Sequence, residues 1–205
     1  YVEVIGKGEN RTNMQVRLAA LSDPEKQTKF ENCVADVNIP LGEVFTSPKL
    51  AGTNGILNVG TVYIGDIQYR NLRMEFKDGR VVSAVCDNFV ENGVIDQEAG
   101  HRLIVQGIMN GHETLPLGEF AIGTNTTAYA MAEKFGILDR LPILIVEKMG
   151  PHFAVGDTCY SMSEDVILHN PDGKEIIAKE NECSALRTTD PASAYFNCHT
   201  DITIP

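Results

Sequence analysis

The sequence predicts an α+β fold made mostly of β-strands and hairpins, with a few helices. Three observations carry this prediction. The first half of the chain contains short runs in which apolar and polar residues alternate, as in strands with one buried face. Asp78-Gly79 lies between two such runs and is a strong hairpin signal. The middle of the chain instead shows helical spacing after a capping residue, Asp96.

Strands are expected along most of the first half. Tyr1–Ile5 and Met14–Leu21 flank the turn-rich segment Gly6–Asn13. The other strands expected here are Phe30–Asn38, Gly55–Val59, Val62–Tyr69, Leu72–Lys77 and Arg80–Cys86. The last two form the hairpin around Asp78-Gly79.

The second half mixes helices and strands. One helix is expected over Glu98–Met109, and another runs to Phe135, capped by Thr126 or Thr127 and ended by Gly136. The expected strands are Leu115–Ile122, Pro151–Gly156, Cys198–Ile204 and a hairpin of Asp165–His169 with Lys174–Ala178. Ile143–Val146 is apolar and buried in either state, whereas the polar segment Glu180–Ala194 is expected to be a loop.

Composition limits the classes of function. The formal net charge of -11 argues against nucleic acid and against an anionic membrane surface as partners. No apolar stretch has the length of a membrane span, and no signal-peptide pattern is present. The five cysteines include no C-x-x-C pair, so reduced thiols and a cytoplasmic location are expected.

The 205 residues are enough for one domain with a sizeable core. The sequence begins at Tyr1 without an initiator Met and stops at Pro205, directly after a strand. We therefore expect residues 1–205 to be a single domain and a fragment of a longer protein.

His199 and Asp201 are the most informative pair of residues. They lie two positions apart in a strand-like run, so both side chains point to the same face. An imidazole and a carboxylate side by side on a rigid strand can bind one metal ion. The alternative is a His–Asp hydrogen bond at the surface of a sheet.

Glu43 and Glu119 occupy similar apolar surroundings. In each case a glycine precedes the glutamate and apolar residues follow it. A glutamate in such surroundings is rarely buried without a partner. That partner is either a metal ion or an Arg or Lys side chain.

His152 is followed on its own strand face by the small residues Ala154 and Gly156, while Phe153 and Val155 point to the core. The small residues leave room for a ligand or an ion, although a structural, hydrogen-bonded histidine is the alternative. Together the two Glu, two His and one Asp suit Zn²⁺, Mn²⁺, Co²⁺ or Fe²⁺, and they suffice for two ions if a carboxylate bridges them.

Four segments carry a family resemblance. They are Leu41–Pro48, Leu117–Ala121, His152–Asp157 and His199–Asp201. In this order they resemble motifs of the thermophilic metalloaminopeptidases, the aminopeptidase T and aminopeptidase S group, and the resemblance runs from about Phe30 to Asp201.

The resemblance implies a metalloaminopeptidase, a hydrolase that releases N-terminal amino acids from peptides by a water activated by two divalent metal ions. The implied ligands of these ions (Zn, Co or Mn) are Glu43, Glu119, His152, His199 and Asp201, on strand and loop segments. The family's catalytic tyrosine falls on Cys159 by direct spacing, or on Tyr160 with a one-residue insertion. The family also implies a homodimer, and a catalytic-type domain separated here from its N-terminal domain and a short C-terminal tail.

Two other readings remain open. The domain could keep the fold as a non-catalytic binding or assembly module. Alternatively, His152, His199 and Asp201 could hold one Fe²⁺, as in the related ring-cleaving dihydroxypyridine dioxygenases. Such a triad has no need of Glu43 or Glu119 as a ligand. The general base is not fixed by the sequence, and Glu113 and Glu147 are the candidates near the motifs.

Overall fold

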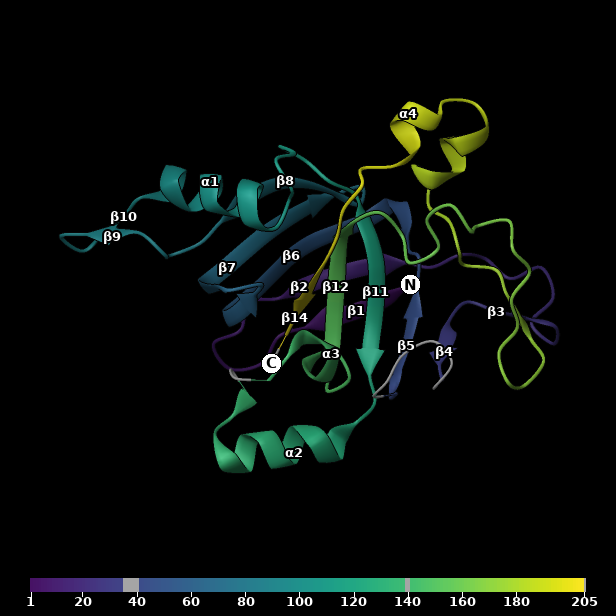
Figure 1. The fold of residues 1–205 in the computed structure, drawn as a ribbon, viewed down its shortest axis with the longest axis horizontal. Helices are drawn as coiled ribbons and strands as arrows, with labels where there is room; N and C mark the ends of the chain where they lie inside the picture. Colours follow the sequence, from purple (N-terminus) through teal and green to yellow (C-terminus); the bar gives the residue numbers. More distant parts are fainter. Residues whose placement is uncertain (35–40, 139–140, 205) are drawn as a thin grey trace.

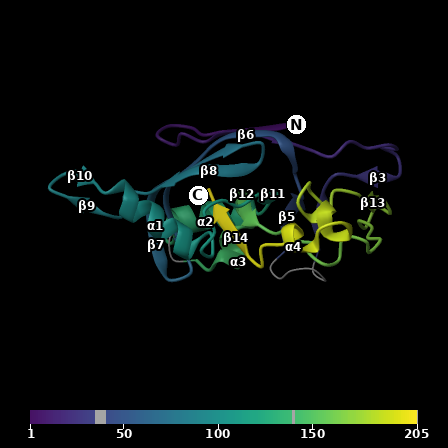
Figure 2. The same ribbon diagram turned by 90° about the horizontal axis from the view of Figure 1, so that it is seen from above.

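Two five-stranded antiparallel sheets form two layers of the molecule (Figures 1 and 2). The structure, a computed structural model, describes residues 1–34, 41–138 and 141–204. The predicted mixture of many strands and a few helices is confirmed.

The first sheet combines two long strands with three shorter ones. Its order is β1-β2-β6-β7-β8, and every neighbouring pair is antiparallel. The strands are β1 (Val2–Ile5), β2 (Asn13–Arg17), β6 (Lys49–Ile64), β7 (Ile67–Lys77) and β8 (Arg80–Val85). The expected hairpin joins β7 to β8, and both Asp78 and Gly79 have positive φ, as a tight hairpin turn requires.

The second sheet has the order β14-β12-β11-β5-β4, again with antiparallel neighbours. Its strands are β4 (Glu31–Cys33), β5 (Glu43–Thr46), β11 (Leu117–Gly123), β12 (Pro151–Gly156) and β14 (His199–Thr203). Its strands follow one another in the order of the sequence, but β6, β7 and β8 lie between β5 and β11 along the chain, so Thr46 pairs with Phe120 across the longest stretch of intervening chain.

The main core lies between the two sheets. Met14, Leu57 and Met74 of the first sheet belong to the same buried cluster as Phe120 and Phe153 of the second. Side chains alternate between the two faces of a strand. The residues next to Phe120 and Phe153 in the sequence therefore point to the opposite face of the second sheet, away from this core.

Short elements connect and cover the sheets. The small strands are β3 (Gln27–Thr28) with β13 (Glu175–Ile176), and β9 (Val90–Glu91) with β10 (Val94–Ile95). The helices are α1 (Gln97–Gly107), α2 (Thr126–Phe135), α3 (Ile143–Val146), the 3₁₀ helix η2 (Ser184–Thr188) and α4 (Pro191–Ala194). Among the described residues no helix has the length and apolar character needed to cross a bilayer.

Helix capping agrees with the sequence at two of the three ends for which a capping residue was expected. The side chain of Asp96 accepts a hydrogen bond from the amide of Ala99 at the start of α1, and Gly136 ends α2 in the left-handed conformation. The expected cap of α2 was wrong by one residue. Asn125, instead of Thr126 or Thr127, accepts the hydrogen bond from the amide of Ala128.

The main error in the strand prediction is in β6 and β7. The sequence suggested a break after Val59 and a strand over Val62–Tyr69. Instead, β6 runs through Gly60 to Ile64, and the turn falls at Gly65-Asp66. Gly65 has a φ of +59°, which glycine adopts without a steric penalty, whereas Gly60 is accommodated within the strand.

Two further strand predictions were too long. β2 ends at Arg17 instead of Leu21, and β4 covers only Glu31–Cys33, while residues 35–38 of that prediction lie outside the described residues. In the expected hairpin after residue 165, the Asn170–Gly173 turn forms. Its second arm, β13, pairs in parallel with β3.

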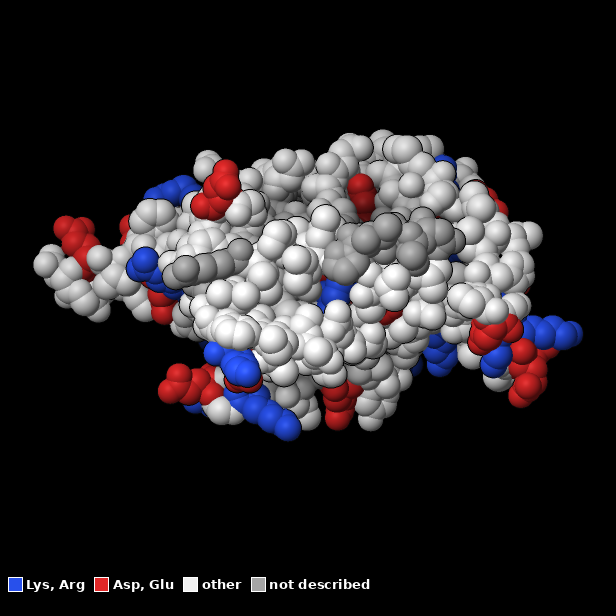
Figure 3. Space-filling view, turned by 60° about the horizontal axis from the view of Figure 1, so that its bottom comes forward, with Lys and Arg blue, Asp and Glu red and all other residues white. Residues whose placement is uncertain are grey.

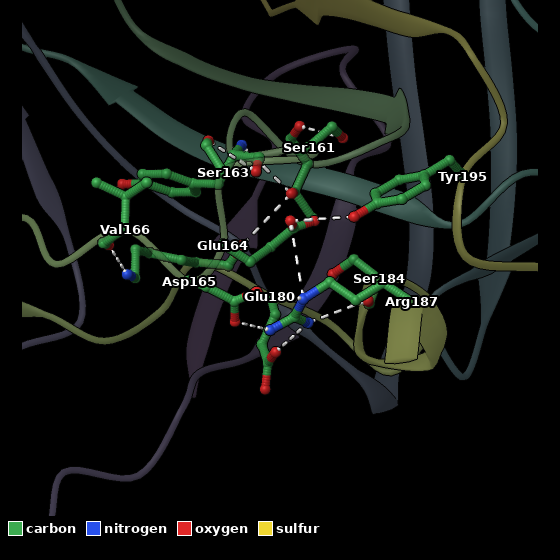
Figure 4. A network of polar contacts seen from close by, with 12 residues as sticks. Ser161, Ser163, Glu164, Asp165, Val166, Glu180, Ser184, Arg187 and Tyr195 are labelled. Carbon is green, nitrogen blue, oxygen red and sulfur yellow. Dashed lines mark hydrogen bonds and ion pairs between the residues drawn. The ribbon is translucent and has the colours of Figure 1, made fainter. Parts of the chain in front are cut away.

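The segment from Ser161 to Tyr195 is held together by Arg187 (Figure 4). The guanidinium lies 2.6 Å from the carboxylate of Asp165 and 2.7 Å from that of Glu180. Its Nε lies 4.0 Å from Glu164, whose carboxylate also accepts a hydrogen bond from the hydroxyl of Tyr195. We call Glu164, Asp165, Glu180 and Arg187 the loop cluster.

The face that carries α2 and α3 is mostly uncharged, with a few charged side chains near its centre and more of them toward its margins (Figure 3). Its exposed apolar side chains include Met131, Phe135, Ile143 and Leu144. The Ile143–Val146 segment, whose state the sequence left open, is the short helix α3. The expectation that this segment is buried was wrong, since none of its four residues is buried and Ile143 and Leu144 are exposed.

Candidate metal centre

One face of the second sheet collects the candidate ligands. In the register of the strands, Asp201 lies opposite Ala154, and Ala154 lies opposite Glu119. His152 and His199 each lie two residues from Ala154 or Asp201 on the same strands, so their side chains share this face.

These side chains surround a cavity of about 170 Å³. The residues that line it are Glu43, Phe45, Glu119, Glu147, His152, Cys159, His199 and Asp201. The structure therefore brings all five predicted ligands to one cavity. Two further lining residues, Glu147 and Cys159, have side chains that can bind a metal ion or hold a proton.

Glu119 lies between the two histidines. One of its oxygens, Oε1, is 3.9 Å from Nε2 of His152, and the other, Oε2, is 3.1 Å from Nε2 of His199. Nε2 of His199 is also 3.5 Å from Oδ1 of Asp201. Ligand atoms around one tetrahedral ion lie roughly 3.3 to 3.7 Å apart, so these spacings suit metal coordination after small adjustments.

Glu43 reaches the same cavity with one oxygen. Its Oε2 is 3.5 Å from Nε2 of His152 and has no hydrogen-bond partner, although the side chain is almost completely buried. A buried carboxylate oxygen without a partner is costly. A cation between Glu43 and His152 would satisfy this oxygen, so the residues present fit a metal ion.

Lys148 holds the other oxygen of Glu43. Its ammonium group is 2.5 Å from Oε1 of Glu43 and 2.5 Å from Oε1 of Glu147. Lys148 is 1% exposed. Burial alone would lower the pKa of Lys148, but the hydrogen bonds to the two glutamates raise it above its ordinary value, so the group is a cation.

The sequence analysis missed Lys148. The available signal was the charged pair Glu147-Lys148 directly after the apolar run Ile143–Val146. Burial also raises the pKa of Glu147 above its ordinary value. Of the two candidates for a general base, only Glu147 lines the cavity, since Glu113 is exposed and paired with His101.

The ring of His199 is oriented by the chain beside it. Its Nδ1 donates a hydrogen bond to the backbone carbonyl of Asp157 at 2.7 Å, which directs Nε2 to the cavity. The carboxylate of Asp157 accepts hydrogen bonds from the amides of Phe196 and Asn197 and so holds the start of β14 in place.

The charges around His199 are strongly coupled. Burial alone would lower its pKa, but the hydrogen bonds to Asp201 and Glu119 raise the pKa to about 11. Burial would likewise raise the pKa of Asp201, yet the interaction with His199 lowers it below its ordinary value. The ring is therefore protonated at neutral pH without a metal, and a metal ion would have to displace that proton.

Tyr160 lies behind the cavity wall. It is buried beside Phe45, with ring centroids 5.9 Å apart, and its hydroxyl donates a hydrogen bond to the carboxylate of Glu31. Burial raises its pKa. Tyr160 is not among the residues that line the cavity, whereas its neighbour Cys159 is. A catalytic role for Tyr160 stays a prediction.

In the described part of the chain, two sets of three candidate ligands are close enough to hold an ion. The ligand atoms of Glu119, His152 and Asp201 lie within 4.8 Å of one another, and so do those of Glu119, Cys159 and His199. Glu119 belongs to both sets. A larger cavity of about 720 Å³ lies elsewhere, near Asn58 and Val62, and its lining residues include no histidine or cysteine.

Residues 3–165 match the family described as thermophilic metalloprotease (M29). This chain belongs to the M29 family of metalloproteases. The resemblance seen in the sequence motifs is thereby confirmed. The matched region contains Glu43, Glu119 and His152, and it ends before His199 and Asp201.

A solved structure shares the fold of this M29 chain. Wild-type AmpT from Thermus thermophilus superposes with a TM-score of 0.53 at 17% sequence identity, over 97% of this chain and 42% of that one. This chain thus corresponds to less than half the length of AmpT. No curated protein matches the sequence.

Proposed function

We propose that this M29 chain is the metal-binding, catalytic part of an aminopeptidase that releases N-terminal amino acids from peptides by a water activated by two divalent cations. The observation that carries the proposal is the position of Glu119, whose two carboxylate oxygens face two different histidines. A carboxylate in this position can bridge two ions.

Each ion would have its own set of ligands beside the shared Glu119. Glu43 and His152 would hold the first, since Oε2 of Glu43 is buried without a partner and faces Nε2 of His152. His199 and Asp201 would hold the second. Asp201 lies close to both sets and can also contribute to the first.

When bound, the two cations would lower the pKa of a water molecule and polarise the scissile carbonyl group. Glu147 is placed to take up a proton at its carboxylate, because it lines the cavity and burial raises its pKa. Lys148 neutralises Glu43 and Glu147 and keeps Oε2 of Glu43 directed at His152.

Selection of the N-terminal residue would come from the cations themselves. Four carboxylates line the cavity, those of Glu43, Glu119, Glu147 and Asp201, and Lys148 contributes one fixed positive charge. Two divalent cations would offset the remaining negative charge, and one of them could bind the free α-amino group of a peptide, which would confine cleavage to the N-terminal residue. Imidazole and carboxylate ligands suit Zn²⁺, Co²⁺ or Mn²⁺.

The iron dioxygenase is the weaker candidate. Its triad would need His152, His199 and Asp201 around one Fe²⁺. Among the described residues, however, the two histidines fall into different sets of candidate ligands. Membership of a metalloprotease family also favours hydrolysis. A non-catalytic module predicts no stoichiometric metal and no effect of Glu119→Ala.

The test is hydrolysis of a panel of aminoacyl anilides by the chain loaded with Zn²⁺, Co²⁺ or Mn²⁺, with metal content and oxygen consumption measured in parallel. Two ions per chain and release of the amino acid support the proposal. Blocking the α-amino group of the substrate by acetylation should abolish hydrolysis. Binding of one iron with consumption of oxygen contradicts the proposal, and so does a failure to hydrolyse any anilide with each of the three metals.

The homodimer, the cytoplasmic location, and a single catalytic-type domain that forms part of a longer protein stay predictions.

A further inference from the structure

Cys159 brings a different donor to the cavity. Its sulfur lies within 4.8 Å of ligand atoms of both Glu119 and His199. Three of the other four cysteines are buried, and Cys198 is half-buried; none of these four lines the cavity or belongs to a set of candidate ligands among the described residues.

The chain around Cys159 is fixed on both sides. On one side, Gly156 turns the backbone at a φ of +109°, and Asp157 is hydrogen-bonded to the start of β14. On the other side, the hydroxyl of Tyr160 donates a hydrogen bond to Glu31, and the backbone amide of Tyr160 donates one to the hydroxyl of Thr158. Tyr160 therefore points away from the cavity while Cys159 faces it.

A second, independent observation points to a cation in this cavity. Oε2 of Glu43 lines the same cavity, is buried and has no hydrogen-bond partner. The need for a cation thus does not depend on the cysteine, and the cysteine lies where a cation between Glu119 and His199 would find a third ligand.

We propose that Cys159 is a ligand of the cation held by Glu119 and His199. The proposal rests on the metal centre described above. A thiolate is a soft ligand, and it favours Zn²⁺, Co²⁺ or Cd²⁺ over Mn²⁺ and Mg²⁺, which prefer oxygen. The centre is accordingly asymmetric, with one position formed by nitrogen and oxygen ligands and one that also includes sulfur.

The test is a spectroscopic titration of the reduced full chain with Co²⁺. Cobalt bound to a thiolate gives a sulfur-to-metal charge-transfer band in the near ultraviolet, which cobalt bound only by nitrogen and oxygen does not give. We compare the unmodified chain with Cys159→Ser and with the matched control Cys198→Ser. Cys198 directly precedes His199 in the sequence but does not line the cavity.

The proposal predicts the band in the unmodified chain and in Cys198→Ser, and its loss in Cys159→Ser with cobalt still bound. It also predicts that the preference for Zn²⁺ over Mn²⁺ falls by at least about tenfold in Cys159→Ser. Cobalt binding and hydrolysis without the band in the unmodified chain would overturn this proposal alone. No cobalt binding at all would overturn both this proposal and the metal centre.

Discussion

The molecule contains two acidic clusters, and they are neutralised in different ways. In the loop cluster, Arg187 contacts Asp165 and Glu180 directly and lies near Glu164 (Figure 4). Around the cavity, Lys148 contacts Glu43 and Glu147, whereas the ion-pair partners of Glu119 and Asp201 among the described residues are histidines.

The difference separates a structural cluster from a candidate site. A guanidinium has five N–H donors in a fixed plane and can satisfy several carboxylates at once. A single ammonium cannot do this for the four carboxylates of the cavity. Each cluster keeps one buried carboxylate oxygen without a hydrogen-bond partner, Oε2 of Glu43 and Oε1 of Glu164. The oxygen of Glu43 faces an imidazole across the cavity, whereas Glu164 lies beside Arg187 and Tyr195. Buried charge that the protein does not neutralise is where a metal ion is expected.

The largest expected effect comes from Glu119→Gln. The amide would remove the charge shared by both ligand sets, so metal affinity should fall by more than about 100-fold and hydrolysis should be lost. Isothermal titration with Zn²⁺ and an anilide assay measure the two effects. Glu113→Gln is the matched control and should behave like the unmodified chain, since Glu113 is exposed. Equal behaviour of the two variants would show that Glu119 has no special role.

Lys148→Met should destabilise the metal-free chain. Breaking a buried ion pair leaves Glu43 and Glu147 without their cation, at a cost of about 3–5 kcal/mol in the free energy of unfolding. Urea denaturation measures this cost. Lys26→Met, which removes an exposed pair with Asp23, should change the same quantity by less than about 1 kcal/mol. A similar small change in Lys148→Met would contradict the description of the cavity.

Metal addition should stabilise the unmodified chain. A free Zn²⁺ concentration 100 times the dissociation constant adds about 2.7 kcal/mol to the free energy of unfolding. Thermal melts with Zn²⁺ and with a chelator measure the difference. Glu119→Gln should show little of it, and an equal shift in both proteins would indicate that zinc binds elsewhere.

Arg187→Met should have a smaller effect on stability and none on the metal. The variant leaves Glu164 and Glu180 without their cation, at a cost of about 1–3 kcal/mol. The number of metal ions bound per chain should stay the same, because Arg187 does not line the cavity. A change in the number of bound metal ions would show that the loop cluster contributes to metal binding, which contradicts its separation from the cavity.

The smallest effect concerns pH. Arg187 holds the pKa of Asp165 below its ordinary value of 3.8. A lowered pKa in the folded state contributes stability that is present above the unfolded value and is lost as the pH falls through the folded value. Acid unfolding of the metal-free chain should include this contribution, and Arg187→Met should lack it.

The sequence predicted which residues face the cavity better than it predicted the strand order and the contacts that position them. The period of two along β12 and β14 places His152 beside Ala154 and His199 beside Asp201, and the family motifs supplied Glu43 and Glu119. The order β14-β12-β11-β5 has no local signal, because it depends on packing between segments far apart in the chain.

Lys148 shows the same limit most clearly. It contacts Glu43 across 105 residues of sequence, and no spacing rule connects two such positions. The length of β6 was also missed, because a glycine within a strand and a glycine in a turn look alike until the register of the neighbouring strand is known.

The most direct test is the number of metal ions that the chain retains after saturation with Zn²⁺ and dialysis, measured by mass spectrometry of the metal. Glu119 between two histidines predicts two ions per chain, falling below one in Glu119→Gln. Retention of none by the unmodified chain, or the same content in both proteins, would contradict the account.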